Sequence, residues 1–174
     1  ISLDVPLLPD RLKAIVHDGL KRNGLKDAYL RLLVTRGKGD LGLDPRACSP
    51  PNVVLIVDKL ALFPDECYRN GLQVIIAETK RNLPEAINPV IKSMNYLNNI
   101  LAKIEANAAG VPEAVMLNHQ GYVAECTGDN VFYVKGNEIV TPPVSAGALE
   151  GITRKTLMSL IREKTSYSMT ENLF

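Results

Sequence analysis

Lys92 is the residue of this sequence whose side chain could act as a nucleophile. It follows a segment that contains Pro84 and Pro89, and its neighbours Ile91 and Met94 are apolar. A lysine ammonium in apolar surroundings loses part of its hydration, and the neutral amine that results can attack an aldehyde to form a Schiff base. On position alone, a solvated lysine near a helix start is the better interpretation, because most lysines are exposed.

Glu125 could supply a second chemical group. It ends a short apolar segment and is followed by residues 126–130, Cys-Thr-Gly-Asp-Asn. A carboxylate at the end of a strand can pair with the protonated ring nitrogen of a bound pyridine, which then withdraws electrons from a substrate carbanion. The alternative is a glutamate of an edge strand that faces water, and without further context that alternative is the better one.

The segment 147–154, Gly-Ala-Leu-Glu-Gly-Ile-Thr-Arg, leads into a predicted helix. Small residues let the backbone approach a ligand, and the N–H groups of a first helical turn, with the Thr153 hydroxyl, favour a phosphate. The alternative is that Gly151 starts the helix and Thr153 caps it. The spacing of a Walker loop is absent.

Three further side chains are candidates for a binding pocket. Tyr29 and Arg31 are two residues apart on a predicted strand, so they share a face and could bind a carboxylate or order a pocket wall. Tyr96 follows Lys92 by four residues and could form a hydrogen bond near it. A strand with one solvated face and a packed tyrosine are the alternatives.

Apolar periodicity and turn residues predict the elements that position these side chains. In the longest predicted helix, Met94, Leu97, Leu101, Ile104 and Ala108 recur at helical spacing and are expected to face the core. A hinge is expected at 64–70 and a loop at 81–91. The predicted helices are 10–22, capped by Asp10, then 94–109 and 153–164; the predicted strands are 28–35, 52–58, 71–79, 114–117, 122–125, 130–135 and 138–141.

Composition narrows the class of protein. The chain has 174 residues, of which 46% are hydrophobic and 22% charged, as in ordinary globular proteins. A net charge of +1 indicates neither a nucleic-acid partner nor a membrane surface. Three cysteines without C-x-x-C spacing and two histidines favour neither a disulfide framework nor a metal site, and they fit a reducing cytoplasm.

Taken in order, these segments resemble a known family. Residues 91–99, Ile-Lys-Ser-Met-Asn-Tyr-Leu-Asn-Asn, resemble the cofactor-lysine region of branched-chain aminotransferases, which are class IV (fold-type IV) enzymes dependent on pyridoxal 5'-phosphate (PLP). Residues 121–125, followed by residue 128 and residues 130–132, resemble the segment of that family that binds the pyridine ring. Residues 141–143 and 147–154 resemble its phosphate-binding turn. The resemblance extends over nearly the whole chain.

The resemblance implies a role for each candidate residue. Lys92 would be catalytic and would hold PLP covalently, Tyr96 would lie near the phenolic oxygen of PLP, and Glu125 would hold the ring nitrogen. Leu149 would pack on the ring face. Gly151, Ile152 and Thr153 would bind the phosphate, and Tyr29 and Arg31 would shape the substrate pocket.

The resemblance also implies a two-domain α/β (α+β) fold of the class IV type. Residues 1–66 would form part of the small N-terminal domain, and residues 67–174 would form part of the larger cofactor-binding domain. No part of the chain matches the family's N-terminal segment, which carries a phosphate-binding arginine. The family also continues beyond the final helix, with strands and another cofactor loop.

The activity implied is reversible transamination of a branched-chain L-amino acid (Leu, Ile or Val) with 2-oxoglutarate, as in the biosynthesis of these amino acids. A homodimer in the cytoplasm is expected, with small amino acids and 2-oxo acids as partners. The alternatives are a D-amino acid aminotransferase or an aminodeoxychorismate lyase on the same scaffold, and a non-catalytic binding protein that keeps the fold.

Overall fold

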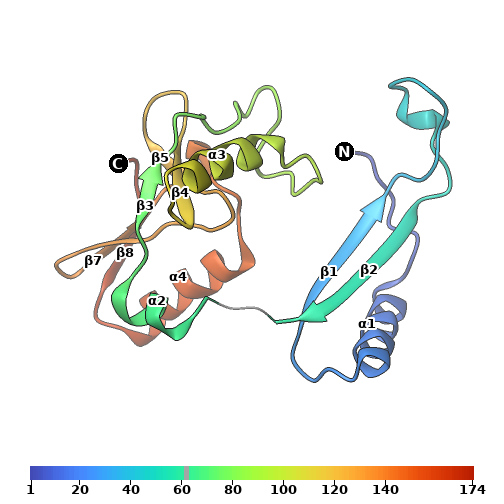
Figure 1. Ribbon diagram of the computed structural model, residues 1–174, viewed down its shortest axis with the longest axis horizontal. Helices are drawn as coiled ribbons and strands as arrows, with labels where there is room; N and C mark the ends of the chain where they lie inside the picture. Colours follow the sequence, from blue (N-terminus) through green and yellow to red (C-terminus); the bar gives the residue numbers. More distant parts are fainter. Residues whose placement is uncertain (61–62) are drawn as a thin grey trace. The chain divides into compact units, whose positions relative to one another are not determined.

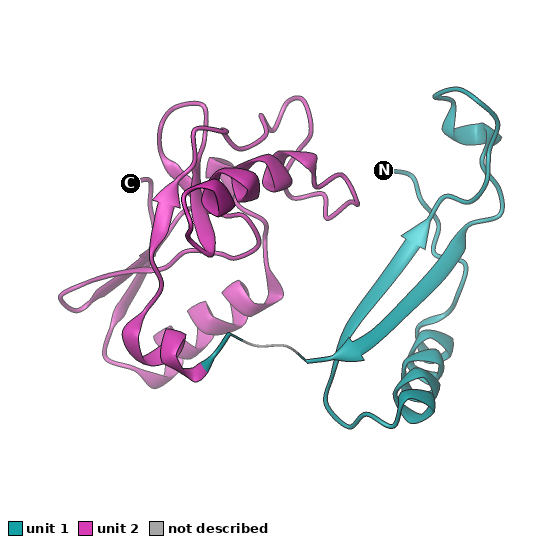
Figure 2. Ribbon diagram, in the orientation of Figure 1, with its two compact units in different colours: residues 1–64 teal, residues 65–174 magenta. Residues whose placement is uncertain are grey.

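The computed structural model describes residues 1–60 and 63–174. The chain divides into two compact units, Ile1–Pro64 and Asp65–Phe174 (Figure 2). None of the helices in the described residues is both long and apolar enough to cross a membrane.

The first unit is a helix on a two-stranded antiparallel ribbon (Figure 1). Strands β1 (Ala28–Thr35) and β2 (Asn52–Lys59) pair along their whole length, from Ala28 opposite Lys59 to Thr35 opposite Asn52. Helix α1 (Pro9–Asn23) approaches β2 at Gly19, where an added Cβ would lie 2.9 Å from Leu55 Cδ2. A short 3-10 helix, η1 (Pro45–Ala47), interrupts the connection between the strands.

The second unit holds two three-stranded sheets, in the orders β3-β4-β5 and β6-β7-β8. In the first sheet β3 and β4 are parallel and β5 is antiparallel to β4; in the second, β6 and β7 are antiparallel and β8 is parallel to β7. The elements in chain order are α2 (Asp65–Asn70), β3 (Val74–Ile76), α3 (Leu97–Ala108), β4 (Glu113–Leu117), β5 (Val123–Cys126), β6 (Tyr133–Lys135), β7 (Glu138–Thr141), η2 (Val144–Ala146), α4 (Ile152–Lys164) and β8 (Ser168–Glu171).

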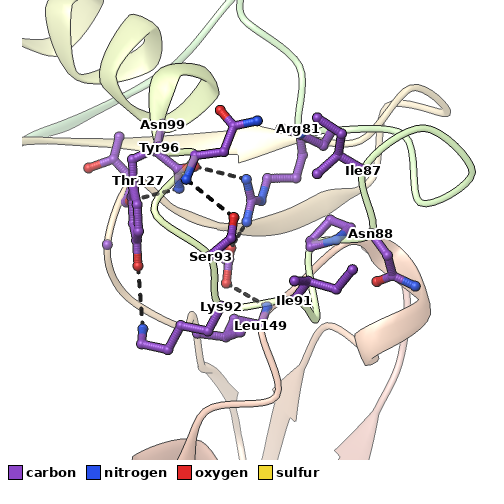
Figure 3. Close-up of a pocket in the computed structure, with 15 residues that line it drawn as sticks. Arg81, Ile87, Asn88, Ile91, Lys92, Ser93, Tyr96, Asn99, Thr127 and Leu149 are labelled. Atoms are coloured by element: carbon purple, nitrogen blue, oxygen red, sulfur yellow. Dashed lines mark hydrogen bonds and ion pairs between the residues drawn. The ribbon is translucent and has the colours of Figure 1, made fainter. Parts of the chain in front are cut away.

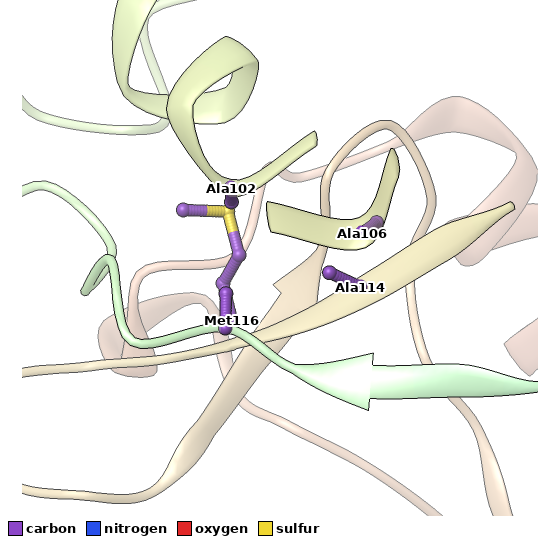
Figure 4. Close-up of a cluster of buried hydrophobic side chains, with 5 residues drawn as sticks. Ala102, Ala106, Ala114 and Met116 are labelled. Carbon is purple, nitrogen blue, oxygen red and sulfur yellow. The ribbon is translucent and has the colours of Figure 1, made fainter. Parts of the chain in front are cut away.

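The core of the second unit lies between α3 and the first sheet (Figure 4). Its fully buried members are Ala77, Ala102, Ala106, Ala114 and Met116. Four of the five are alanines, which bring the helix and sheet backbones close, and Met116 fills the space that remains. This packing fixes α3 on β4, next to the strand that carries Glu125.

The predicted buried face of the long helix is wrong. Its buried residues are Asn99, Ala102 and Ala106, whereas Leu101 and Ile104 are 46% and 56% exposed. The prediction followed the large apolar side chains, but the face that packs on the sheet carries small ones. The helix also begins at Leu97, with Tyr96 as its N-cap, so residues 94–96 lie before it.

Other predicted boundaries need smaller corrections. Asp10 does not cap α1: the N-cap is Leu8, and Pro9 occupies the first helical position, where its missing N–H is not needed. Thr153 lies inside α4, whose N-cap is Gly151. The expected hinge includes helix α2, and strand β8 was not predicted. The strand expected at 71–79 is confined to Val74–Ile76. Residues 61 and 62 lie outside the described residues.

Candidate active site

One pocket of the second unit brings together four of the predicted site residues: Lys92, Tyr96, Glu125 and Leu149 (Figure 3). Its volume is about 80 Å³. Lys92 lies in the loop that precedes α3, Tyr96 caps that helix, Glu125 is on β5, and Leu149 comes shortly before α4. Side chains that are 57 residues apart in sequence thus face one space.

Lys92 lies at the solvent-exposed side of this pocket. Its side chain is exposed, and its Nζ donates a hydrogen bond of 3.4 Å to the Tyr96 hydroxyl. The neighbours Ile91 and Met94 are 42% and 64% exposed. The apolar enclosure expected for this lysine is therefore not provided by the described residues.

Glu125 lies at the buried side of the pocket. It is 5% exposed, although β5 is an edge strand of its sheet. One carboxylate oxygen lies 2.7 Å from Arg81 Nη2, and the other accepts the Leu149 N–H at 2.8 Å. Burial raises the pKa of Glu125, and the Leu149 N–H and the Arg81 guanidinium act against that rise. The alternative of a glutamate that faces water is wrong.

Asn130 ties the carboxylate to the segment that enters α4. Its amide nitrogen donates to the Leu149 carbonyl at 3.0 Å and lies 3.4 Å from Glu125 Oε2. A Cβ added to Gly151 would lie only 2.5 Å from the Asn130 side-chain oxygen. A side chain at position 151 would therefore force the Asn130 amide or the turn itself to shift.

The predicted phosphate-binding residues lie outside this pocket. Gly151, Ile152 and Thr153 form the start of α4 and are not among the residues that line it; Ile152 is 85% exposed. The next residue, Arg154, is buried, donates to the Pro142 carbonyl and pairs with Glu171 on β8. This anchors the first turn of the helix while leaving Ile152 and Thr153 on the surface of the described chain.

Tyr29 and Arg31 belong to the first unit. Both lie on β1, and the Arg31 guanidinium donates two hydrogen bonds, of 3.2 and 3.0 Å, to the Tyr29 hydroxyl. The guanidinium carbon is 5.5 Å from the centre of the tyrosine ring. The pair shares a face of the strand as alternation predicts, and its part in a substrate pocket stays a prediction.

Several residues that line the pocket were given no role by the sequence, and Arg81, Asn99 and Thr127 are among them. Arg81 lies in a segment predicted to be a loop, where an arginine is normally solvated. Thr127 lies between the two segments that resemble the pyridine-binding region, and no role was assigned to it. Asn99 could have been found, because it shares the spacing of Ala102 and Ala106, the small residues that pack on the sheet.

The family is shown by comparison with known proteins. Residues 1–172 match the family model described as amino-transferase class IV. A candidate branched-chain-amino-acid aminotransferase of Methanocaldococcus jannaschii is 44% identical over 164 residues, which are 94% of this chain and 56% of that protein. The chain therefore belongs to the class IV aminotransferases, as its motifs predicted, and it spans about half the length of these relatives.

Solved structures confirm the fold. The branched-chain amino acid aminotransferase of Escherichia coli has a TM-score of 0.92 at 29% identity, with 99% of this chain and 57% of that chain covered. The T.th. branched-chain amino acid aminotransferase complexed with N-(5'-phosphopyridoxyl)-L-glutamate has a TM-score of 0.85 at 29% identity, with 98% of this chain and 54% of that chain covered. The predicted class IV fold is thus confirmed for this part of the protein.

Proposed function

We propose that the protein is a PLP-dependent aminotransferase that exchanges an amino group between a branched-chain L-amino acid (Leu, Ile or Val) and 2-oxoglutarate. One observation carries the proposal: an exposed lysine amine, a tyrosine hydroxyl and a buried carboxylate face one pocket, as Lys92, Tyr96 and Glu125. The similarity to branched-chain aminotransferases supports it, as does the relative that binds a phosphopyridoxyl derivative of L-glutamate.

These three groups fit the ring end of PLP. A primary amine suits its aldehyde, a hydroxyl suits its phenolic oxygen, and a carboxylate suits its ring nitrogen, and the described pocket lining presents each of these groups. The volume of about 80 Å³ is below the roughly 300–1,000 Å³ of complete ligand pockets. The described residues would therefore enclose only part of the cofactor.

The phosphate end is proposed to lie at the start of α4. The unpaired N–H groups of a first helical turn and the helix dipole favour an anion, and the Thr153 hydroxyl adds a donor. Gly151 and Ile152 would contribute their backbone. Asn130 and Leu149 link this turn to the Glu125 carboxylate through hydrogen bonds, so both ends of the cofactor would be held by one connected set of residues.

Bound PLP supplies an electron sink for the carbanion that forms at the substrate Cα. Lys92 would release the cofactor to the substrate amine, and its free Nζ would then move a proton from the Cα. Glu125 would hold a proton on the ring nitrogen, and Tyr96 would hold the phenolic oxygen and the lysine. Leu149 would pack on the face of the ring and exclude water from it.

Three further assignments belong to the same proposal. Tyr29 and Arg31 would help to bind the substrate, since their fixed hydroxyl and guanidinium present donors suited to a carboxylate. The protein would work in the cytoplasm, and it would be a homodimer.

The proposal is tested by assaying the whole protein with PLP against L-leucine, D-alanine and aminodeoxychorismate, with 2-oxoglutarate as the amino acceptor for the two amino acids. Glutamate formed from 2-oxoglutarate, and pyruvate released from aminodeoxychorismate, are measured by mass spectrometry. We expect glutamate with L-leucine, and none with D-alanine. Turnover of D-alanine or of aminodeoxychorismate alone would keep the scaffold and replace the substrate. No turnover of any of the three would contradict the proposal.

A further inference from the structure

Arg81 is a loop residue whose side chain is only 9% exposed. Its Nη2 contacts Glu125 at 2.7 Å, while its Nη1 donates to Asn99 Oδ1 at 3.0 Å and to Asn98 Oδ1 at 3.2 Å. One guanidinium therefore joins the carboxylate of β5 to two amides in the first turn of α3. Figure 3 shows Arg81 and Asn99 directed toward one another above the lysine loop.

The two asparagines are themselves held in place. Asn99 is buried, and its Nδ2 donates to the Thr127 carbonyl at 2.8 Å. Asn98 donates to the Lys80 carbonyl and accepts the Asn82 N–H, at 2.8 and 3.2 Å. Both of these side-chain amides have partners on their nitrogen and on their oxygen, so the oxygens that receive Arg81 cannot rotate away without loss of another hydrogen bond.

A second contact fastens the same loop to the same helix. Glu105 on α3 accepts the backbone N–H groups of Glu78 and Thr79 and the Thr79 hydroxyl. The loop is thus attached at both ends of the helix face, at Asn98 and at Glu105. Fixing an arginine side chain costs about 2 kcal/mol of rotamer entropy. Because the loop and the Arg81 side chain are already held on α3, less of this entropy is lost when a ligand binds.

The charge of Glu125 depends on this arginine. Burial disfavours the carboxylate and raises its pKa, and the Leu149 N–H, the Arg81 guanidinium and the more distant Lys92 ammonium oppose that effect. A neutral carboxyl group cannot pair with a protonated ring nitrogen as a counter-charge, and a carboxylate that is held only by its chain would be free to turn away from the ring.

We propose that Arg81, held by Asn98 and Asn99, is a positioning residue that keeps the Glu125 carboxylate charged and directed toward the ring nitrogen of the cofactor. The inference rests on the proposed function, because it assigns a ring nitrogen to this pocket. Arg81 also weakens Glu125 as a proton acceptor, since its donors occupy carboxylate lone pairs. The proton therefore stays on the ring nitrogen, which is the state that withdraws electrons.

The test compares Arg81→Met with the unaltered protein and with Arg162→Met, a control that removes an exposed arginine of α4. In protein without cofactor, the side-chain carboxyl of Glu125 is followed by carbon-13 NMR as a function of pH. In the loaded protein, the dissociation constant for PLP is measured by absorbance. We expect Arg81→Met to move the carboxyl titration to higher pH and to weaken PLP binding by about 10–100-fold, by analogy with the loss of a residue that orients a metal ligand.

Arg81→Lys guards against a variant that fails to fold. Lysine keeps the charge but cannot contact Glu125 and two asparagines at once, so we expect it to retain the carboxyl titration and to recover only part of the PLP affinity. An unchanged carboxyl titration in folded Arg81→Met, beside normal PLP binding by the unaltered protein, would overturn this inference alone. Absence of PLP binding by the unaltered protein would overturn the proposed function, and the inference with it.

Discussion

The Glu125 carboxylate and the Lys92 amine face the same pocket but differ in burial and in their number of contacts. Glu125 is buried and contacts Arg81, Leu149 and Asn130, each of which has further partners. Lys92 is exposed and has one long hydrogen bond, to Tyr96. The group that would only hold charge thus has several partners within the fold, whereas the group that would make and break bonds is exposed.

This difference fits the demands of the proposed chemistry. A counter-charge works best when it is preorganised and does not reorganise during the reaction. A lysine that releases a cofactor and then transfers a proton must change its position between steps. The two sides should therefore respond differently to mutation: changes at Lys92 should affect the reaction, and changes at Glu125 should affect the fold as well.

The largest effect is expected for Lys92→Ala. Loss of the amine should reduce transamination by at least about 10³-fold, because no other group of the described pocket can take the role of nucleophile and base. The midpoint of urea unfolding should hardly change, since the side chain is exposed. Lys135→Ala, at an exposed position of β6, serves as the control. A Lys92→Ala protein with substantial activity would contradict the assignment.

Glu125→Leu tests the buried group of the pocket, and its main effect should be on the stability of the fold. It leaves the Arg81 guanidinium buried without its counter-charge, which should lower the free energy of unfolding by about 3–5 kcal/mol. Removal of one partner of an exposed pair, as in Glu150→Ala beside Lys155, should cost about 0–1 kcal/mol. Urea unfolding of the three proteins measures both values. Equal losses would show that the buried pair is not special.

Cys126 reports on the dry, negative surroundings of Glu125. Burial raises its pKa to about 12, and the nearby Glu113 and Asp129 carboxylates add to the rise. Because the thiolate is the reactive form, the rate of Cys126 alkylation at pH 8 should be at least about 100-fold lower than that of an ordinary thiol. This rate should continue to increase with pH above about pH 10. Peptide mass spectrometry after timed labelling gives the rate. Rapid alkylation at pH 8 would mean that this region is open to water.

Gly151→Ala tests the link between the carboxylate and the start of α4. The added Cβ would lie 2.5 Å from the Asn130 side-chain oxygen, so Asn130 or the turn must shift. We expect a loss of about 1–3 kcal/mol in stability, as for other overpacked sites, and weaker binding of PLP. Thermal unfolding and an absorbance titration measure the two effects. Unchanged values of both would separate Asn130 from the proposed phosphate turn.

The residues that lie in family-like motifs could be predicted from the sequence, whereas the residues that position them by hydrogen bonds could not. Lys92, Tyr96 and Glu125 could be predicted because a segment of fixed order surrounds each of them. Arg81 could not, because its partner is 44 residues away and lies beside it only in the folded sheet, where the Arg81 N–H donates to the Leu117 carbonyl of β4. The pattern of large apolar residues also gave the wrong face of α3, since alanines occupy the tight contact.

The most direct test of the account is to find which lysine carries the cofactor. The whole protein is loaded with PLP and reduced with borohydride, which fixes the cofactor's aldehyde carbon to the amine that holds it, and the peptides are then analysed by mass spectrometry. We expect the added mass on Lys92 and its absence in Lys92→Ala. The same mass on another lysine, or on none in a folded protein, would contradict it.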